Sequence, residues 1–197
     1  MTKIIGLTGQ SGAGKTTVSE IFAKNGFGVI NCDLIARKAT ENGSECNKQL
    51  AEFFPDCFDE NFMLDRKALS REVFGDPDKN KILGTIIYPY ITKLIEKEIL
   101  RLSGEYDYIL LDAPTLFEAG ADKLCSIKIA VLADPEIRLE RIMQRDGISE
   151  TLAKKRFSSQ HSADFFKEKC DYVIYNNGEA ESAAEQAEKI IGMIKES

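Results

Sequence analysis

The sequence KIIGLTGQSGAGKTT, residues 3–17, decides the fold of this chain. Its first six residues form a short, largely apolar run, which is typical of a strand buried on both faces of a parallel sheet. Residues 9–16, GQSGAGKT, match the pattern G-x-x-x-x-G-K-[ST] of the P-loop. A helical pattern follows over residues 16–25 and stops before Gly26. Strand, glycine-rich loop and helix together predict a site for a nucleoside triphosphate.

The P-loop pattern has a physical basis. Its glycines let backbone N–H groups converge on phosphate oxygens, and the N-terminus of the following helix adds the positive end of a dipole. Lys15 can reach the β- and γ-phosphates, and the Thr16 hydroxyl can ligate Mg2+. A chance match is expected in roughly one chain of this length in a hundred, and the strand and helix around it make chance rarer. The pattern does not identify the acceptor of the phosphoryl group.

Strands and helices alternate along the rest of the chain. Between residues 41 and 103 helical spacing prevails and no strong strand pattern appears, so we expect a mostly helical insertion there. Five strands alternating with helices predict an α/β fold, a three-layer P-loop NTPase arrangement around a five-stranded parallel sheet, in one domain of 197 residues. The expected strands are 3–8, 27–31, 107–112, 126–133 and 171–175, and the later helices are 66–74, 82–102, 135–145 (with Asp134 as a candidate cap) and 179–195.

Composition and charge argue against several classes of protein. The chain has 26 Lys and Arg against 32 Asp and Glu, a net charge of -6, which disfavours a broad surface for nucleic acid. No apolar stretch is long enough to span a membrane, and no signal-peptide pattern is present. The five cysteines are widely spaced, which fits neither a disulfide framework nor a zinc site. We expect a reduced, cytoplasmic protein, either a monomer or a small homo-oligomer.

Two aspartates follow strands at the sheet edge where open α/β sheets bind ligands. Asp33 comes just after the second strand, where its carboxylate can accept a proton from an acceptor hydroxyl or hold the metal ion. Its alternative role is to cap a helix that begins at Leu34. Asp112 ends the third strand, the position of an acidic residue that holds Mg2+ through water, although turns also use aspartate there. Asp33 and Asp112 therefore compete for the metal position beside Thr16.

A basic segment lies in the second half of this acidic chain. Arg138, Arg141 and Arg145 share one face of the helix after the fourth strand. Six basic and four acidic residues give residues 136–156 a net charge of +2, as a lid over an anion requires, although a solvated helix face has the same pattern. His161 is the only histidine, so a carboxylate is the better candidate for a general base, and we assign His161 no role.

Five stretches occur in an order that is more specific than the P-loop alone. They are TGQSGAGKTT (8–17), VINCDLIAR (29–37), APTLFE (113–118), RIMQRDG (141–147) with Arg156 and Gln160 beyond it, and CDYVIYNNG (170–178). Together they closely resemble the dephospho-CoA kinase family over nearly the whole chain. APTLFE is similar to the family's proline, two-leucine, phenylalanine, glutamate segment, with Thr115 in place of the first leucine. The last two stretches resemble the family's lid and its adenine-side loop.

The resemblance implies a kinase that transfers the γ-phosphoryl group of ATP to the 3'-hydroxyl of the ribose in dephospho-CoA, giving coenzyme A and ADP. It implies Mg2+ as cofactor, a helical acceptor-binding insertion over about 41–103, and a lid over about 138–165. The expected site residues are Asp33, Lys15, Arg141 and Arg145 for catalysis; Gly12, Ala13, Gly14, Lys15, Thr16, Thr17, Asn176 and Asn177 for ATP; Arg37, Tyr88, Phe117 and Glu118 for the acceptor; and Thr16 and Asp112 for the metal.

The sequence departs from the family's pattern at two places. Family members usually have Asp-Ala-Asp where this chain has Asn31-Cys32-Asp33, and His-Pro where it has Tyr88-Pro89. Asn31 can accept a hydrogen bond but carries no charge. Tyr88 can donate a hydrogen bond, but it cannot replace an imidazole in proton transfer near neutral pH. Asp33, the central residue of the expected mechanism, is retained.

Two alternative functions share parts of this pattern. The nearer one is another small P-loop kinase that acts on a nucleoside or a nucleoside monophosphate, with the same fold and a different acceptor domain. The other is a nucleotide-dependent switch or binding module, which would signal through mobile loops. The sequence contains no guanine-reading N-K-x-D motif, and a basic lid favours phosphoryl transfer over signalling.

Overall fold

The chain alternates strands and helices, as the sequence predicts. The computed structural model describes residues 2–73, 76–158, 160–178 and 180–196. The strands are β1 (Lys3–Gly9), β2 (Gly28–Asn31), β3 (Tyr108–Asp112), β4 (Ile127–Leu132) and β5 (Tyr172–Tyr175). The helices of the described residues are α1 (Lys15–Lys24), α2 (Cys32–Ala39), α3 (Glu45–Phe53), α4 (Arg66–Val73), α5 (Pro77–Leu102), α6 (Pro135–Asp146), α7 (Glu150–Ser158), α8 (Ala163–Lys169) and α9 (Ala180–Glu196), with short 3-10 turns η1 (Pro55–Cys57) and η2 (Ala121–Leu124).

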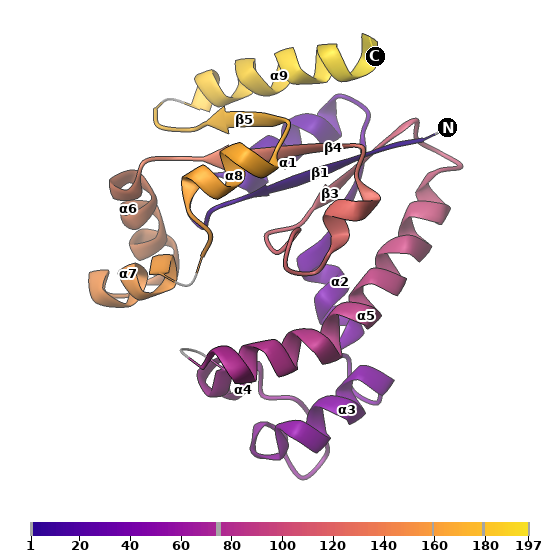
Figure 1. The fold of residues 1–197 in the computed structure, drawn as a ribbon, viewed down its shortest axis with the longest axis vertical. Helices are drawn as coiled ribbons and strands as arrows, with labels where there is room; N and C mark the ends of the chain where they lie inside the picture. The colour runs from indigo at the N-terminus through magenta and orange to yellow at the C-terminus, as the bar shows by residue number, and fades with distance from the viewer. Residues whose placement is uncertain (1, 74–75, 159, 179, 197) are drawn as a thin grey trace.

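All five strands are parallel and form one sheet in the order β2-β3-β1-β4-β5 (Figure 1). The predicted α/β fold with a five-stranded parallel sheet is confirmed. The carboxyl ends of parallel strands share one edge. There Leu7 of β1 and Asn31 of β2 both pair with Asp112 of β3. The P-loop after β1 and the helix α2 after β2 therefore begin beside Asp112.

Helices cover both faces of the sheet (Figure 1). On one face α1 and α9 bury Phe22, Ala187 and Ile191 against the strands. On the other face α2 and the C-terminal part of α5 bury Ile35 and Ile95, and α8 adds a smaller cluster beside β4. Within the described part of the chain, no helix combines the length and the apolar character that a membrane crossing needs.

The predicted helical insertion has its own small core. α3, η1, α4 and the N-terminal part of α5 lie away from the sheet, in the lower part of Figure 1, and bury Leu50, Phe54, Leu69 and Ile86. An isolated antiparallel bridge joins Phe58 and Leu64 there. α5 connects this core to the sheet, since its C-terminal residues pack under β2 and β3. The segment expected to be a mostly helical insertion, residues 41–103, thus forms a helical subdomain.

Several element boundaries differ from the expected ones. The helix expected at 82–102 begins earlier, at Pro77, because Asp76 caps it by accepting hydrogen bonds from the backbone N–H groups of Asp78 and Lys79, both at 3.0 Å. Its first turns are polar and therefore lack apolar periodicity. Residues 74 and 179, expected at helix ends, lie outside the described residues. Asp134, the candidate cap of α6, makes no side-chain cap bond.

Candidate active site at the P-loop

The P-loop closes around the N-terminus of α1. Gly14 is the N-cap of α1 with a left-handed backbone (φ 90°), and no side-chain oxygen of the described residues caps the helix. The N–H groups of the first turn are therefore left for a ligand, and the helix dipole favours an anion. Gly12 also has a positive φ of 80°, and a Cβ there would lie 2.7 Å from the carbonyl oxygen of Arg138. Glycine is required at both positions.

Lys15 forms an ion pair with Asp112 at the end of β3. The two side chains are only 16% and 6% exposed, respectively. A charge so deeply placed needs an opposite charge, and a phosphate that displaced the carboxylate would give Lys15 an equivalent anionic partner. Thr16 follows at an exposed position in the first turn of α1. The P-loop cation and the strand-end carboxylate predicted from the sequence therefore meet in the structure.

Asp33 is exposed in the first turn of α2. The cap of α2 is Asn31, whose Oδ1 accepts a hydrogen bond from the backbone N–H of Leu34 at 3.0 Å. The alternative interpretation of Asp33 as the cap is therefore wrong, because Asn31 already fills that position. Burial, together with the nearby carboxylates of Asp112 and Asp33, raises the pKa of the Cys32 thiol to about 12. Asp33 thus follows the end of β2, where Asn31 pairs with Asp112 of β3, and its side chain does not cap the helix.

Arg138 differs from the other two arginines of α6, Arg141 and Arg145, in its surroundings. It is buried, with 4% of its surface exposed. Its Nε donates to the carbonyl oxygen of Ser11 at 2.9 Å, and its Nη2 donates to Oε1 of Gln160 at 3.0 Å. Its guanidinium also lies 4.1 Å from the ring centroid of Phe157, and burial lowers the pKa of Arg138. Arg138 therefore binds the backbone of the P-loop at Ser11, and its guanidinium is used in contacts within the protein.

Arg141 and Asn176 contact the P-loop from two different elements. Nη1 of Arg141 donates to the carbonyl oxygens of Gly12 at 3.3 Å and Asn176 at 3.1 Å. Asn176, which follows β5, is buried, and its Nδ2 donates to the carbonyl oxygen of Ala13 at 2.8 Å. Asn177 comes next and is exposed. The structure therefore brings the two predicted regions, α6 and the loop after β5, onto the P-loop.

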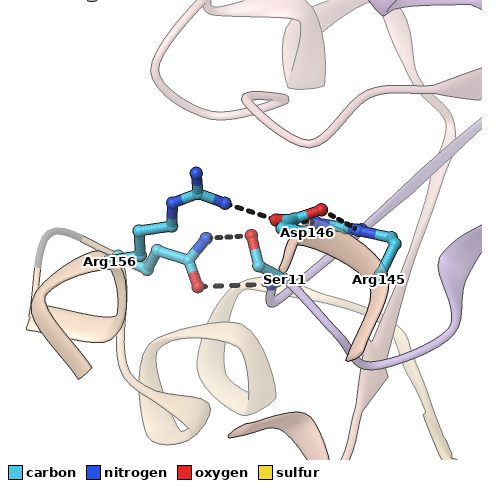
Figure 2. Close-up of polar contacts among 5 residues, drawn as sticks. Ser11, Arg145, Asp146 and Arg156 are labelled. Atoms are coloured by element: carbon cyan, nitrogen blue, oxygen red, sulfur yellow. Dashed lines mark hydrogen bonds and ion pairs between the residues drawn. The ribbon is translucent and has the colours of Figure 1, made fainter. Parts of the chain in front are cut away.

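Arg145 is turned toward Asp146. Its Nε and Nη2 donate to the two carboxylate oxygens of Asp146 at 2.7 and 3.0 Å, and Arg156 of α7 donates to one of the same oxygens (Figure 2). The bonds from Arg145, and then from Arg156, hold the pKa of Asp146 at about 2, below its ordinary value of 3.8. The Arg145 side chain is 63% exposed. Asp146 thus joins α6 to α7 through two basic side chains.

A groove of about 1920 Å3 is lined by residues of α4, α5 and α7 together with Glu118, Ala119 and His161. Ordinary small-molecule sites measure about 300–1,000 Å3, so this groove has room for a long ligand. Tyr88 and Glu118 line it, and His161 lies beside Glu118, with Nε2 3.5 Å from Oε1. The His161 ring stacks on Phe165 with a centroid separation of 3.7 Å. The carbonyl oxygen of His161 accepts a hydrogen bond from Nε2 of Gln10 at 3.1 Å, so the groove adjoins the P-loop.

The other two expected acceptor residues lie apart from the described lining of this groove. Arg37 is exposed on α2. The Phe117 ring packs edge-on against Phe165, with centroids 5.2 Å apart, in the cluster under α8. Burial, and then the charge of Glu118, raise the pKa of Tyr88. Acceptor contacts from Arg37, Tyr88, Phe117 and Glu118 stay predictions, with Tyr88 and Glu118 best placed for them.

The oxygen donors beside the P-loop suit a magnesium ion that arrives with a nucleotide. Thr16 offers a hydroxyl, and Asp112 and Asp33 offer carboxylates, the hard ligands that Mg2+ prefers. Among the described residues, no three His, Cys, Asp or Glu side chains form a closed metal cage. Mg2+ is commonly held by one or two protein oxygens and by substrate phosphates. The donor set therefore fits Mg-ATP.

Comparisons with known proteins agree with this geometry. A family model described as dephospho-CoA kinase matches residues 3–182. The chain belongs to the dephospho-CoA kinase family. It is 37% identical over 186 residues to the dephospho-CoA kinase of Fusobacterium nucleatum, which covers 94% of this chain and 95% of the relative. It is 34% identical to the dephospho-CoA kinase of Oryza sativa, covering 98% of this chain and 85% of the relative.

A solved structure from the same family supports the assignment. The dephospho-CoA kinase from Campylobacter jejuni matches with a TM-score of 0.71 and 29% sequence identity, and the match covers 98% of both chains. The resemblance noted in the sequence is therefore confirmed. Because the match spans the whole fold, it includes the helical subdomain and the segment 138–165 as well as the sheet.

The sequence does not predict the positions of three residues at the site of this dephospho-CoA kinase family member. Arg138 resembles a lid arginine but is buried against Ser11. Gln160 is visible only as part of the family's lid pattern, and His161 has polar neighbours that indicate simple exposure. The local sequence carries no signal that residue 160 folds back onto residue 11, which lies 149 positions earlier. Only the tertiary contacts reveal their positions.

Proposed function

We propose that the P-loop binds ATP and that the groove along α5 binds dephospho-CoA, with the two substrates meeting beside Asp33. As a member of the dephospho-CoA kinase family, the chain transfers the γ-phosphoryl group of ATP to dephospho-CoA, which gives coenzyme A and ADP. The observation that carries the proposal is the hydrogen bond between Gln10 of the P-loop and His161 of the groove. A donor site and an acceptor site that share a wall suit direct transfer between two bound substrates.

The donor site uses backbone and side-chain groups of the P-loop. The N–H groups of Gly12, Gly14, Lys15, Thr16 and Thr17 surround the β- and γ-phosphates in this proposal. Ala13 belongs to the same loop, and its own N–H donates to the carbonyl oxygen of Gln10 at 3.1 Å. Lys15 exchanges its Asp112 partner for phosphate oxygens and neutralises the charge of the transferred group. Asn176 and Asn177 lie beside the adenine, an arrangement that the contact between Asn176 and Ala13 supports.

Asp33 orients the acceptor and receives its proton. As the 3'-hydroxyl oxygen bonds to the γ-phosphorus, its proton passes to a carboxylate oxygen of Asp33, and the bond from phosphorus to the β,γ-bridging oxygen breaks, releasing ADP. The exposed position of Asp33 at the start of α2 leaves its carboxylate accessible for this role. Because phosphoryl transfer needs placement more than covalent chemistry, a single carboxylate is enough.

The arginines of α6 stabilise the transferring group. Arg141 already contacts the carbonyl oxygen of Gly12, which places its guanidinium beside the loop that binds the phosphates in this proposal. Arg145 must leave Asp146 to bind a phosphate oxygen, so its contact with the transferring group forms only when the nucleotide is bound. Closure of residues 138–165 over the site excludes water and suppresses wasteful hydrolysis of ATP.

Thr16, with Asp112 or Asp33 as the second protein ligand, would hold a magnesium ion, which would supply positive charge to neutralise the phosphates. The acceptor side relies on Tyr88 and Glu118, which line the groove. Arg37 and Phe117 lie apart from that lining, and their contacts with the acceptor are predictions from the family resemblance. We place the enzyme in the cytoplasm, which the five free cysteines support, because their thiols suit a reducing compartment.

The decisive experiment measures ADP release from Mg-ATP with dephospho-CoA, in parallel with nucleosides, nucleoside monophosphates and no acceptor. We expect ADP release that depends on dephospho-CoA, and mass spectrometry should find one added phosphate on that acceptor. Turnover with a nucleoside or a monophosphate instead would support the alternative small-kinase function. ADP release without any acceptor would favour a switch or a binding module.

A further inference from the structure

The side chain of Gln160 bridges the P-loop and α6. Its Oε1 accepts hydrogen bonds from the backbone N–H of Ser11 at 3.2 Å and from Nη2 of Arg138 at 3.0 Å, and its Nε2 donates to Oγ of Ser11 at 2.5 Å. One carboxamide therefore satisfies both the backbone and the side chain of a P-loop residue. Gln160 itself is half-buried.

The groups around Gln160 are closely packed. Arg138 is buried and donates to the carbonyl oxygen of Ser11 as well as to Gln160. The backbone of α6 at Arg138 lies so close to Gly12 that a Cβ on Gly12 would come within 2.7 Å of it. A buried guanidinium is costly unless its donors are paired, so the Gln160 oxygen is part of what keeps Arg138 in place.

A second bond ties the same part of the chain to the P-loop. The carbonyl oxygen of His161 accepts from the side chain of Gln10, which is 8% exposed. Gln160 is thus bonded to Ser11, and His161 to Gln10. None of these bonds uses the N–H groups of the first turn of α1, which the proposed donor site leaves for phosphate.

We propose that Gln160 is a positioning residue for ATP: by fixing Ser11 against Arg138, it holds the P-loop in the conformation that binds phosphate. The inference rests on the proposed placement of ATP on the P-loop. Backbone N–H groups bind phosphate well only when they converge in advance, and small misplacements of such groups cost large factors in binding and rate. Gln160 acts through Ser11 and needs no contact with the nucleotide.

Two substitutions of equal length separate positioning from simple packing. Gln160→Met keeps the size of the side chain but removes all three hydrogen bonds. Gln160→Glu keeps the oxygen that accepts from Ser11 and Arg138 and loses only the donated bond to Oγ of Ser11. We expect Gln160→Met to weaken ATP binding by about 10-fold to 100-fold, and Gln160→Glu to restore it to within about threefold of the unmodified protein. The KM for dephospho-CoA should stay within about twofold in both.

The matched control is Gln186→Met in α9. Gln186 also makes a carboxamide bridge, because its Oε1 accepts from the backbone N–H of Tyr175 and its Nε2 donates to the carbonyl oxygen of Tyr175, both at 2.9 Å. Its loss removes the same kind of bond from β5 and breaks no bond made by residues 10–14, while the neighbouring Asn176 keeps its own backbone bond to Leu132. We expect ATP affinity within about twofold of the unmodified protein for this variant.

The measurement is calorimetric titration with Mg-ATP in the absence of acceptor, alongside thermal unfolding of each variant. The inference is overturned if folded Gln160→Met binds ATP as tightly as the unmodified protein, if Gln160→Glu binds as weakly as Gln160→Met, or if Gln186→Met loses as much affinity. Failure of the unmodified protein itself to bind ATP would instead remove the proposed donor site. The role of Gln160 and the site on which it depends are thereby tested separately.

Discussion

Asn176 occupies the space beside Gly14 of the P-loop. Its Nδ2 donates to the carbonyl oxygen of Ala13 at 2.8 Å, and a Cβ placed on Gly14 would overlap that same nitrogen atom. The backbone N–H of Asn176 donates to the carbonyl oxygen of Leu132 at 2.9 Å, so β4 holds the asparagine in position. The shape of the phosphate loop is therefore set partly by a residue that comes 163 positions after Ala13.

Gly14→Ala should damage both the donor site and the fold. The new methyl group displaces Asn176, and the backbone at residue 14 has a φ of 90°, which L-residues rarely adopt. We expect a loss of about 1–3 kcal/mol in the free energy of unfolding and at least a tenfold weaker affinity for ATP, about 1.4 kcal/mol. Urea unfolding and calorimetric titration measure the two effects.

Gly26→Ala is the control for this prediction. Gly26 also has a positive φ, 85°, but nothing lies within 4 Å of a Cβ built there. The substitution should cost about 1 kcal/mol of backbone strain and leave ATP affinity unchanged. Equal ATP affinities for Gly14→Ala and Gly26→Ala would contradict the role of Asn176 and Gly14 in shaping the P-loop.

Asp33→Asn should separate catalysis from binding. The amide keeps the shape of the side chain but cannot take the proton of the acceptor hydroxyl at neutral pH, so we expect turnover to fall by a factor of about 10² to 10⁴. The KM for ATP should change by less than about threefold, because Asp33 makes none of the proposed phosphate contacts and Asp112 stays available as the second magnesium ligand. Steady-state assays with dephospho-CoA and Mg-ATP measure both constants.

Asp107→Asn is the matched control. Asp107 is also an exposed carboxylate, but it precedes β3 at the opposite edge of the sheet from the P-loop. Its turnover should equal that of the unmodified protein. If Asp33→Asn retained normal turnover, Asp33 would have to be removed from the proposed mechanism.

Asp146→Asn should weaken the link between α6 and α7 in a pH-dependent manner. The side chains of Arg145 and Arg156 are 63% and 42% exposed, so water screens the pairs and we expect a loss of about 1 kcal/mol in the free energy of unfolding near pH 7. The pKa of Asp146 is about 2 in the folded protein and ordinarily 3.8. Its stabilising effect is therefore complete above about pH 5 and disappears as the pH falls toward 2.

Urea unfolding of both proteins near pH 7, about pH 5 and about pH 3 tests this prediction. The difference between Asp146→Asn and the unmodified protein should be the same at the two higher values and smaller at the lowest. A difference that stayed constant through pH 3 would show that the carboxylate charge is not what stabilises the link.

The sheet and the donor loop could be read from the sequence because their signals are local. Apolar runs predict the buried strands, and glycines at fixed offsets before Lys15 predict a loop that binds phosphate. The strand positions agree with the structure to within one residue or two at each end. The early start of α5 was missed, since its first turn is polar and is specified by a cap instead of apolar periodicity.

The hydrogen-bond partners of the site residues could not be predicted from local sequence. Sequence spacing put Arg138 and Arg145 on one helix face, yet one is buried against Ser11 and the other pairs with Asp146. The sequence left Asp33 as either a base or a cap, and only the hydrogen bond of Asn31 decides against the cap. Each of these contacts depends on which groups lie next to each other in the folded protein.

The sequence by itself therefore determined the α/β fold, the family and the phosphate loop, because backbone geometry and apolar periodicity are encoded over a few neighbouring residues. The tertiary structure decided that Asn176 fits beside Gly14, that Gln160 holds Ser11, and that a groove reaches the P-loop at His161. These contacts join segments about 150 residues apart, and their energies come from burial and hydrogen-bond geometry that exist only after the sheet and helices have assembled.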